Sequence, residues 1–177
     1  RLSFDLFLVG SILLMALYHL GLFIFRKDDL APLYFSFFCF LTALRSVTTG
    51  GRYLILLFPG ISWELMIKLE YLSFYLAVPA FAMFMQSLFP KFSEKFLLTL
   101  KALAIAFSCA VVFAPARFYT HTLNIYEIIT LIGLIYTLYV AFSSFNQNRI
   151  EACGFLFGFA ILSLTIVNDM LHVEGII

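Results

Sequence analysis

Ionisable and polar side chains near the ends of apolar segments are the residues of this sequence most able to do chemistry. An ionisable group inside a membrane segment is costly, so it usually faces a protein interior or a wet cavity and has a partner. Such groups gather at the end of the second apolar segment, at the start of the third and at the end of the sixth. The candidates for lining a signal or ligand cavity are Arg45, Glu64, Lys68, Glu70, Tyr71, Asn168, Asp169 and His172.

The spacing of the charged candidates indicates which of them need a partner from another segment. Glu64 and Lys68 are four residues apart with the acid first, the better order for an intrahelical pair. Near an interface this is more often a solvated pair than a binding site. Glu70 lies about 200° around the helix from Lys68, so its partner must come from elsewhere. Arg45, on the adjacent antiparallel segment, is the predicted partner of Glu70.

Four further polar groups have other candidate partners or structural interpretations. Glu127 follows Asn124 by three residues, the spacing of a capping box, which predicts that it satisfies the start of the fifth segment. His19 is more often a satisfied interior histidine than a ligand. Asp169 could pair with His172, three residues on, or compete for the arginine of the second segment.

The sequence signals no catalytic centre. H-E-x-x-H, G-x-S-x-G, P-loop and Cys-x-x-Cys patterns do not occur, so no nucleophile, metal site or cofactor is expected, and the chain is not predicted to be an enzyme. The three histidines form no bis-histidine cofactor pair at a plausible spacing. An odd number of cysteines inside apolar runs indicates small core residues rather than a disulfide framework. These cysteines are Cys39, Cys109 and Cys153.

The elements that must position the candidates are transmembrane helices. Of the 177 residues, 63% are apolar and 12% are charged, with a mean hydropathy of +1.04 and a net charge of +1. This composition indicates a membrane protein and disfavours nucleic acid as a partner. A helix needs about 20 mostly apolar residues to cross the hydrocarbon core. Six segments meet this length and predict one all-α, polytopic transmembrane bundle over residues 1–177: 4–25, 31–49, 62–89, 93–114, 123–145 and 152–172.

Small residues and prolines mark the connections. Thr49-Gly50-Gly51 and Pro59-Gly60 predict a loop between the second and third segments, and Ser93 can cap the fourth. Gly154 and Gly158 have the small-xxx-small spacing that permits close packing of the sixth helix against another.

Pro79 lies inside the third segment. Its ring removes the backbone hydrogen bond to the carbonyl of Tyr75. We expect a kink there rather than a break, because neighbouring helices can satisfy the freed carbonyl.

Lysines and arginines predict the orientation. Six lie in or beside the connections on one side and three on the other, a bias that places both ends of the chain outside the cytoplasm. The six are Arg26, Lys27, Lys91, Lys95, Lys101 and Arg149, and the three are Arg1, Arg52 and Arg117. In this orientation nearly every embedded polar group falls in the outer third of the bundle. We therefore predict a polar cavity that is open to the outside and closed below by an apolar plug.

Several short sequence motifs, distributed over nearly the whole chain, have an order and spacing that are typical of one protein family. These motifs are Tyr18-His19-Leu20-Gly21-Leu22-Phe23, Arg26-Lys27-Asp28-Asp29, Pro32-Leu33-Tyr34-Phe35, Ala43-Leu44-Arg45, Leu57-Phe58-Pro59-Gly60, Trp63-Glu64-Leu65, Lys68-Leu69-Glu70-Tyr71-Leu72, Pro115-Ala116-Arg117, Tyr119-Thr120, Asn168-Asp169-Met170-Leu171 and Gly175-Ile176-Ile177. Together they resemble the membrane module of bacterial seven-transmembrane receptors with diverse intracellular signalling modules. The resemblance implies an inner-membrane receptor that senses an extracytoplasmic signal and passes it to a cytoplasmic module such as a histidine kinase, a diguanylate cyclase or a phosphatase. It also implies a seventh helix, so this chain is expected to be part of a longer receptor.

Two other functions stay open from the sequence. A small-solute transporter or channel subunit would need polar groups that continue past the midplane, where the sequence offers little beyond Ser, Thr, Tyr and His19. The second alternative is a membrane anchor, which would only need the chain to insert into the bilayer. The expected partners are the lipid bilayer, an extracytoplasmic ligand or sensor domain and a cytoplasmic signalling domain, with a homodimer left open.

Overall fold

Every element in the described part of the chain is a helix. The computed structural model describes residues 2–49, 53–114, 122–144 and 158. The helices are α1 (Leu2–Phe25), α2 (Ala31–Thr48), α3 (Tyr53–Leu57), α4 (Trp63–Leu88), α5 (Glu94–Phe113) and α7 (Thr122–Ser144). All but the short α3 are long and apolar enough to cross a membrane, which gives 5 candidate spans. The predicted all-α membrane bundle is confirmed. The sixth predicted segment, 152–172, lies outside the described residues except for Gly158.

Local capping explains where α4 and α5 begin. The Ser62 hydroxyl accepts a hydrogen bond from the backbone N–H of Leu65 (3.2 Å), and the Ser93 hydroxyl accepts one from Phe96 (3.5 Å). Each serine therefore satisfies one of the donors left free in a first helical turn. The cap predicted at Ser93 is confirmed.

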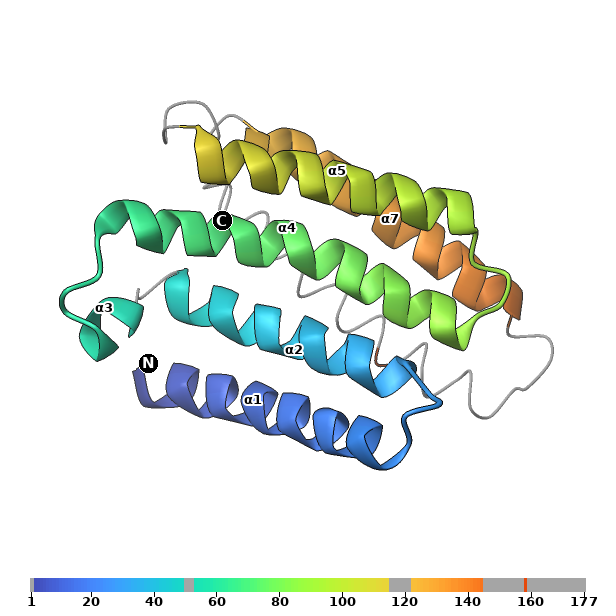
Figure 1. The fold of residues 1–177 in the computed structure, drawn as a ribbon, viewed down its shortest axis with the longest axis horizontal. Helices are drawn as coiled ribbons and strands as arrows, with labels where there is room; N and C mark the ends of the chain where they lie inside the picture. The colour runs from blue at the N-terminus through green and yellow to red at the C-terminus, as the bar shows by residue number, and fades with distance from the viewer. Residues whose placement is uncertain (1, 50–52, 115–121, 145–157, 159–177) are drawn as a thin grey trace.

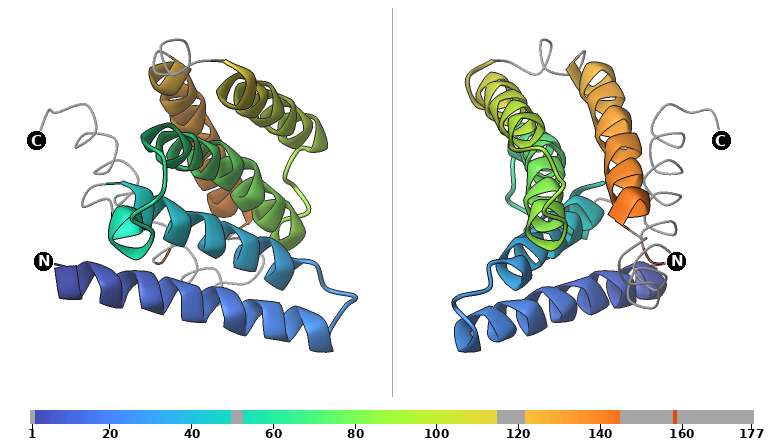
Figure 2. Two further views of the ribbon diagram at one scale, coloured as in Figure 1. Left: turned by 60° about the vertical axis from the view of Figure 1, so that its left-hand side comes forward. Right: turned by 90° about the vertical axis from the view of Figure 1, so that its right-hand side faces the viewer.

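Four helices form a row in which each is antiparallel to the next. Figure 1 shows the order α1, α2, α4, α5, and Figure 2 shows α7 on one side of this row, where it packs on α4. Helices α1, α4 and α7 begin at one end of the bundle, which we call the N-terminal end. Two ring contacts fix the register of α2 on α4, because Phe35 lies 4.8 Å from Phe84 and Phe38 lies 5.1 Å from Phe81 between ring centroids.

The segment between α2 and α4 contains a helical turn that the sequence analysis did not predict. A loop was expected there, but Tyr53–Leu57 form α3. Leu54 is 9% exposed, and its carbonyl accepts from the N–H of Phe58 (2.9 Å). The Tyr53 hydroxyl donates to the carboxylate of Asp5 on α1 (2.5 Å). Burial of one apolar side chain and a tertiary hydrogen bond thus stabilise a turn too short to be stable alone.

Two clusters of buried side chains lie along α4, α5 and α7. The tyrosine cluster, nearer the N-terminal end, is formed by Phe74, Tyr75, Val111 and Tyr126. The aliphatic cluster, nearer the opposite end, is formed by Ala82, Met85, Phe92, Leu97, Leu100, Val140 and Ala141. Large apolar side chains elsewhere on the helices are exposed, which suits contact with lipid.

Candidate functional site

Arg45 contacts α4 through an aromatic ring. It lies in the last turn of α2, and its Cζ atom is 4.5 Å from the centroid of the Phe74 ring. This contact has the same register as the Phe38–Phe81 ring pair. Arg45 lies two helical turns after Phe38 on α2, and Phe74 lies two turns before Phe81 on the antiparallel α4. A guanidinium over a ring face is attracted by the ring quadrupole, and more strongly where water is excluded. The half-buried cation therefore joins α2 to the tyrosine cluster.

Glu70 and Tyr71 lie on the part of α4 that Arg45 reaches. Glu70 is half-buried and lies one turn before Phe74, so the two side chains share a helix face. The Tyr71 ring is edge-on to the Tyr75 ring with 6.0 Å between centroids. The pairing of Arg45 with Glu70 stays a prediction, and the placement of the guanidinium one turn away is compatible with it.

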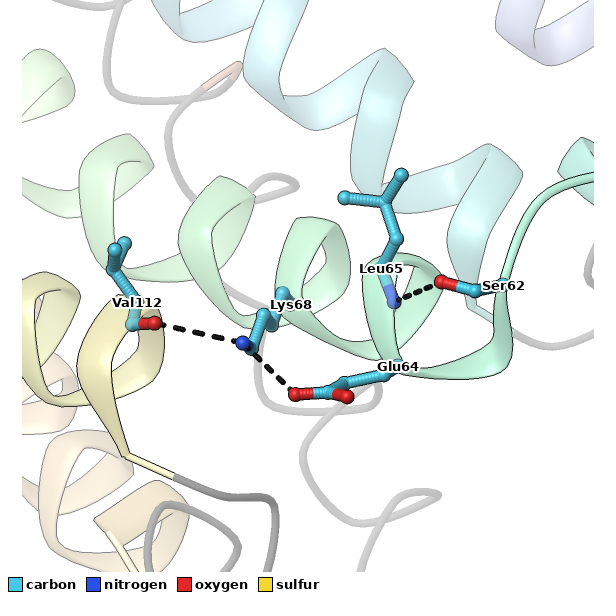
Figure 3. A network of polar contacts seen from close by, with 5 residues as sticks. All are labelled: Ser62, Glu64, Leu65, Lys68 and Val112. Atoms are coloured by element: carbon cyan, nitrogen blue, oxygen red, sulfur yellow. Dashed lines mark hydrogen bonds and ion pairs between the residues drawn. The ribbon is translucent and has the colours of Figure 1, made fainter.

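Lys68 joins α4 to α5 at the N-terminal end. Figure 3 shows its ammonium between two oxygens, the Glu64 carboxylate at 2.9 Å and the Val112 carbonyl at 3.5 Å. Val112 lies in the last turn of α5, where carbonyls lack intrahelical donors. The Glu64 side chain is 60% exposed, so this ion pair is a solvated one. The intrahelical pairing is confirmed, and the contact with α5 is an addition to it.

Both hydroxyls of the tyrosine cluster have hydrogen-bond partners. Tyr75 and Tyr126 are 0% exposed, and their ring centroids are 4.5 Å apart. The Tyr75 hydroxyl bonds with the Thr122 hydroxyl at 2.9 Å. The Tyr126 hydroxyl donates to the backbone carbonyl of Tyr75 at 2.7 Å. These two bonds hold the first turns of α7 against the middle of α4.

The carbonyl that Tyr126 satisfies is the one that Pro79 frees. Helix α4 runs unbroken from Trp63 to Leu88 with Pro79 buried inside it. The residue four before the proline is Tyr75, whose carbonyl loses its intrahelical donor. The expectation that a neighbouring helix satisfies this carbonyl, and that the helix does not break, is confirmed. The sequence did not indicate that α7 and Tyr126 supply the donor.

Glu127 departs from its predicted role. Helix α7 begins at Thr122, so Asn124 lies inside the helix rather than at its N-cap, and Glu127 lies beyond the first turn. The capping box is therefore wrong. Glu127 is 6% exposed, which makes it a buried acid of α7 next to Tyr126. Three-residue spacing alone could not distinguish a cap from a buried position in the second turn.

Two other polar groups lie against neighbouring helices. Asp5, which the sequence analysis did not single out, accepts from Tyr53 across α1 and α3. The His19 Nδ1 donates to the Met15 carbonyl of its own helix (2.9 Å), and its ring packs on Phe35 with 4.6 Å between centroids. The interpretation of His19 as a satisfied histidine is confirmed, but its ring is half-buried rather than interior.

The candidates near the end of the sequence lie outside the described residues. These are Asn168, Asp169, His172 and Gly154. Gly158 is exposed, and in the described part of the chain nothing lies within 4 Å of a Cβ built on it. Its role in helix packing stays a prediction. A group of at least 3 possible metal ligands does not occur among the residues that the structure describes.

Three polar or cationic contacts in the N-terminal half of the bundle each join two helices. Arg45 joins α2 to α4, Lys68 joins α4 to α5, and Tyr126 joins α7 to α4, each through one polar or cationic contact. A bound group that competes for any of these contacts alters which helices are held together. A ligand changes helix packing only through contacts that differ between two packings, and contacts between helices are of this kind.

Comparison with known proteins gives a family match over the whole chain. The family model described as 7TM diverse intracellular signalling matches residues 1–177. Searches of curated proteins and of solved structures gave no match.

Proposed function

The chain belongs to the 7TM diverse intracellular signalling family, and from this premise we propose that its bundle passes an extracytoplasmic signal to a cytoplasmic output domain. The observation that carries the proposal is the contact of Arg45 on α2 with Phe74 on α4, one turn from Glu70. A ligand or sensor domain that binds one packing of α2 and α4 better than another shifts the population between them. Only such differential binding can drive the change.

The signal enters at the N-terminal end and is read as a shift of helices. Arg45, Glu64, Lys68, Glu70 and Tyr71 form the part of the site that lies in α2 and α4. Asn168, Asp169 and His172 are proposed to complete it from the sixth segment, with Asp169 as a second acid for Arg45. Packed helices move between discrete arrangements rather than deform continuously, so small shifts at this end can be amplified.

The packing of the opposite half supports a receptor over a transporter. The aliphatic cluster fills the space between α4, α5 and α7 with apolar side chains, and Met85 within it is 0% exposed. A transport route would need polar groups there to replace the hydration shell of the solute. The cluster is instead suited to transmit a displacement by direct contact.

The proposal includes the membrane and the output. We place the bundle in a bacterial inner membrane with both ends of this chain extracytoplasmic, so that Arg26, Lys27, Lys91 and Lys95 face the cytoplasm. The output domain is of the histidine kinase, diguanylate cyclase or phosphatase type. Reporter fusions at Lys27 and Lys91 should be active only for a cytoplasmic reporter, and the opposite result would reverse the orientation.

Substitution of Arg45 and of Glu70 in the full-length receptor tests the function. Arg45→Ala and Glu70→Gln should each change the signal output at unchanged amounts of membrane-inserted protein. Glu94→Gln, an exposed acid in the first turn of α5, and Arg26→Ala, an exposed arginine, both lie at the opposite end of the bundle. They are the matched controls and should leave the output unchanged. Normal regulation in both test variants would contradict the proposal, and normal regulation after exchange of the whole bundle would leave only an anchor.

A further inference from the structure

The backbone of α4 depends on α7 at one atom. The Tyr75 carbonyl has lost its intrahelical donor to Pro79 and accepts from the Tyr126 hydroxyl at 2.7 Å. Both tyrosines are 0% exposed, so water does not reach this carbonyl in the described packing. An unsatisfied carbonyl at this depth is costly. The backbone of α4 around the proline and the position of α7 are therefore constrained by the same bond.

This bond lies between the polar groups of the N-terminal end and the aliphatic cluster. Phe74, which Arg45 contacts, is edge-on to the Tyr126 ring with 5.5 Å between centroids. Val78 and Ile129 pack against both the tyrosine cluster and the aliphatic cluster. Val78 precedes the proline, and Ile129 lies one turn after Tyr126. Contacts are thus continuous from the arginine, through the bond, to the opposite half of the bundle.

We propose that Pro79, the Tyr75 carbonyl and the Tyr126 hydroxyl form a latch that couples the bend of α4 to the position of α7. The latch deepens the proposed function, because it names the point where a change near Arg45 is passed to the far half of α4 and α7. When the hydroxyl leaves the carbonyl, α4 bends at the proline so that the carbonyl reaches another donor, and α7 is released from the middle of α4.

A proline makes the bond suitable for this role. In an ordinary helix the carbonyl at this position is bonded by its own chain, and a tyrosine from another helix adds little. Here the hydroxyl belongs to a separate helix, so the bond forms only in one relative position of α4 and α7. The second bond, between the Tyr75 and Thr122 hydroxyls, joins two side chains and leaves the backbone of α4 unaffected.

A double-mutant cycle on the full chain in detergent micelles tests the latch. Tyr126→Phe removes the hydroxyl and keeps the ring. Its equilibrium constant for folding should fall about three- to tenfold, the range for buried hydrogen bonds between membrane helices. In a Pro79→Ala background the same change should cost less than about twofold, because the backbone N–H that alanine restores at this position then satisfies the carbonyl.

Tyr75→Phe is the matched control for the cycle. It deletes the other buried hydroxyl of the tyrosine cluster without affecting the carbonyl, so its cost should be the same with the native proline and in the Pro79→Ala background. Equal effects of Tyr126→Phe in both backgrounds would overturn the latch. If the cost of Tyr75→Phe also fell in the Pro79→Ala background, the latch would be overturned as well, since the proline would then act on the whole tyrosine cluster.

A signalling measurement separates the latch from the function that it serves. In the full-length receptor, Tyr126→Phe should change basal output at least about twofold, and Pro79→Ala should suppress that change. Additive effects on output would overturn the latch as a signalling element even where the Arg45 and Glu70 variants alter regulation. If the cycle in micelles shows coupling while those two variants signal normally, the latch stands as a packing device and the proposed function fails.

Discussion

The tyrosine cluster and the aliphatic cluster lie on the same three helices but hold them together in different ways. Tyr75 and Tyr126 are buried with each hydroxyl bonded to a particular oxygen, of Thr122 or of the α4 backbone. Met85 is equally buried, and the fully buried side chains around it have no strong hydrogen-bonding group. At the edge of this cluster the Tyr136 hydroxyl accepts from the backbone N–H of Ser93 (3.1 Å). Directional bonds fix how α7 is placed on α4, whereas apolar packing requires mainly the right volume. The difference assigns directional bonds to the buried interior of one half of the bundle and apolar packing to the buried interior of the other.

The largest effect should come from a cavity in the aliphatic cluster. Met85→Ala removes a fully buried side chain and should lower the free energy of unfolding by about 2–5 kcal/mol. Met85→Leu nearly conserves volume and should cost less than about 1.5 kcal/mol. Titration with a denaturing detergent, followed by the loss of helical signal, measures both. A leucine as costly as alanine would show that this cluster is as specific in its contacts as the tyrosine cluster, and the comparison would fail.

A smaller effect is expected from the cation at the edge of the tyrosine cluster. Arg45→Ala should lower the free energy of unfolding by about 1–2 kcal/mol, because it removes a partly desolvated cation from the Phe74 ring. Arg45→Lys should recover part of this loss, since an ammonium keeps the charge but not the planar stacking.

A cycle with Phe74→Leu separates the ring contact from other effects of the arginine. The coupling between the two substitutions should be about 0.5–1 kcal/mol. If the two substitutions lowered the free energy of unfolding independently, Arg45 would not stabilise the tyrosine cluster. The directional contacts of that cluster would then be those of its hydroxyl groups alone. Directional contacts would then be limited to α4 and α7.

The sequence predicted the helices and the proline well because these depend on local chemistry. Each described span begins and ends within about two residues of its predicted bounds, since length and composition decide whether a segment can cross a bilayer. The orphaned Tyr75 carbonyl follows from ring geometry alone. The identity of its donor does not, because Tyr126 is 51 residues away and only the placement of α7 on α4 brings it there.

The failures have the same physical cause. The helical turn α3 depends on Leu54 being buried and on Asp5, which is 48 residues before its partner Tyr53. The capping box at Asn124 matched a local pattern, but α7 begins before Asn124, and Glu127 is buried in its second turn. Local sequence patterns do not predict which residues of different helices come into contact, and the candidate site consists of such contacts.

The smallest effects should come from the solvated end of the site. Glu64→Gln removes an exposed i, i+4 pair and should cost about 0.3–0.5 kcal/mol at low ionic strength, an effect that about 0.5 M salt abolishes. Lys68→Met should cost more, about 0.5–1 kcal/mol, because the ammonium also reaches the Val112 carbonyl at the end of α5. Its side chain is only 24% exposed, so part of this cost should persist in salt. Identical salt sensitivity of the two variants would mean that Lys68 acts only through Glu64, and Lys68 would then not join α4 to α5 at the N-terminal end.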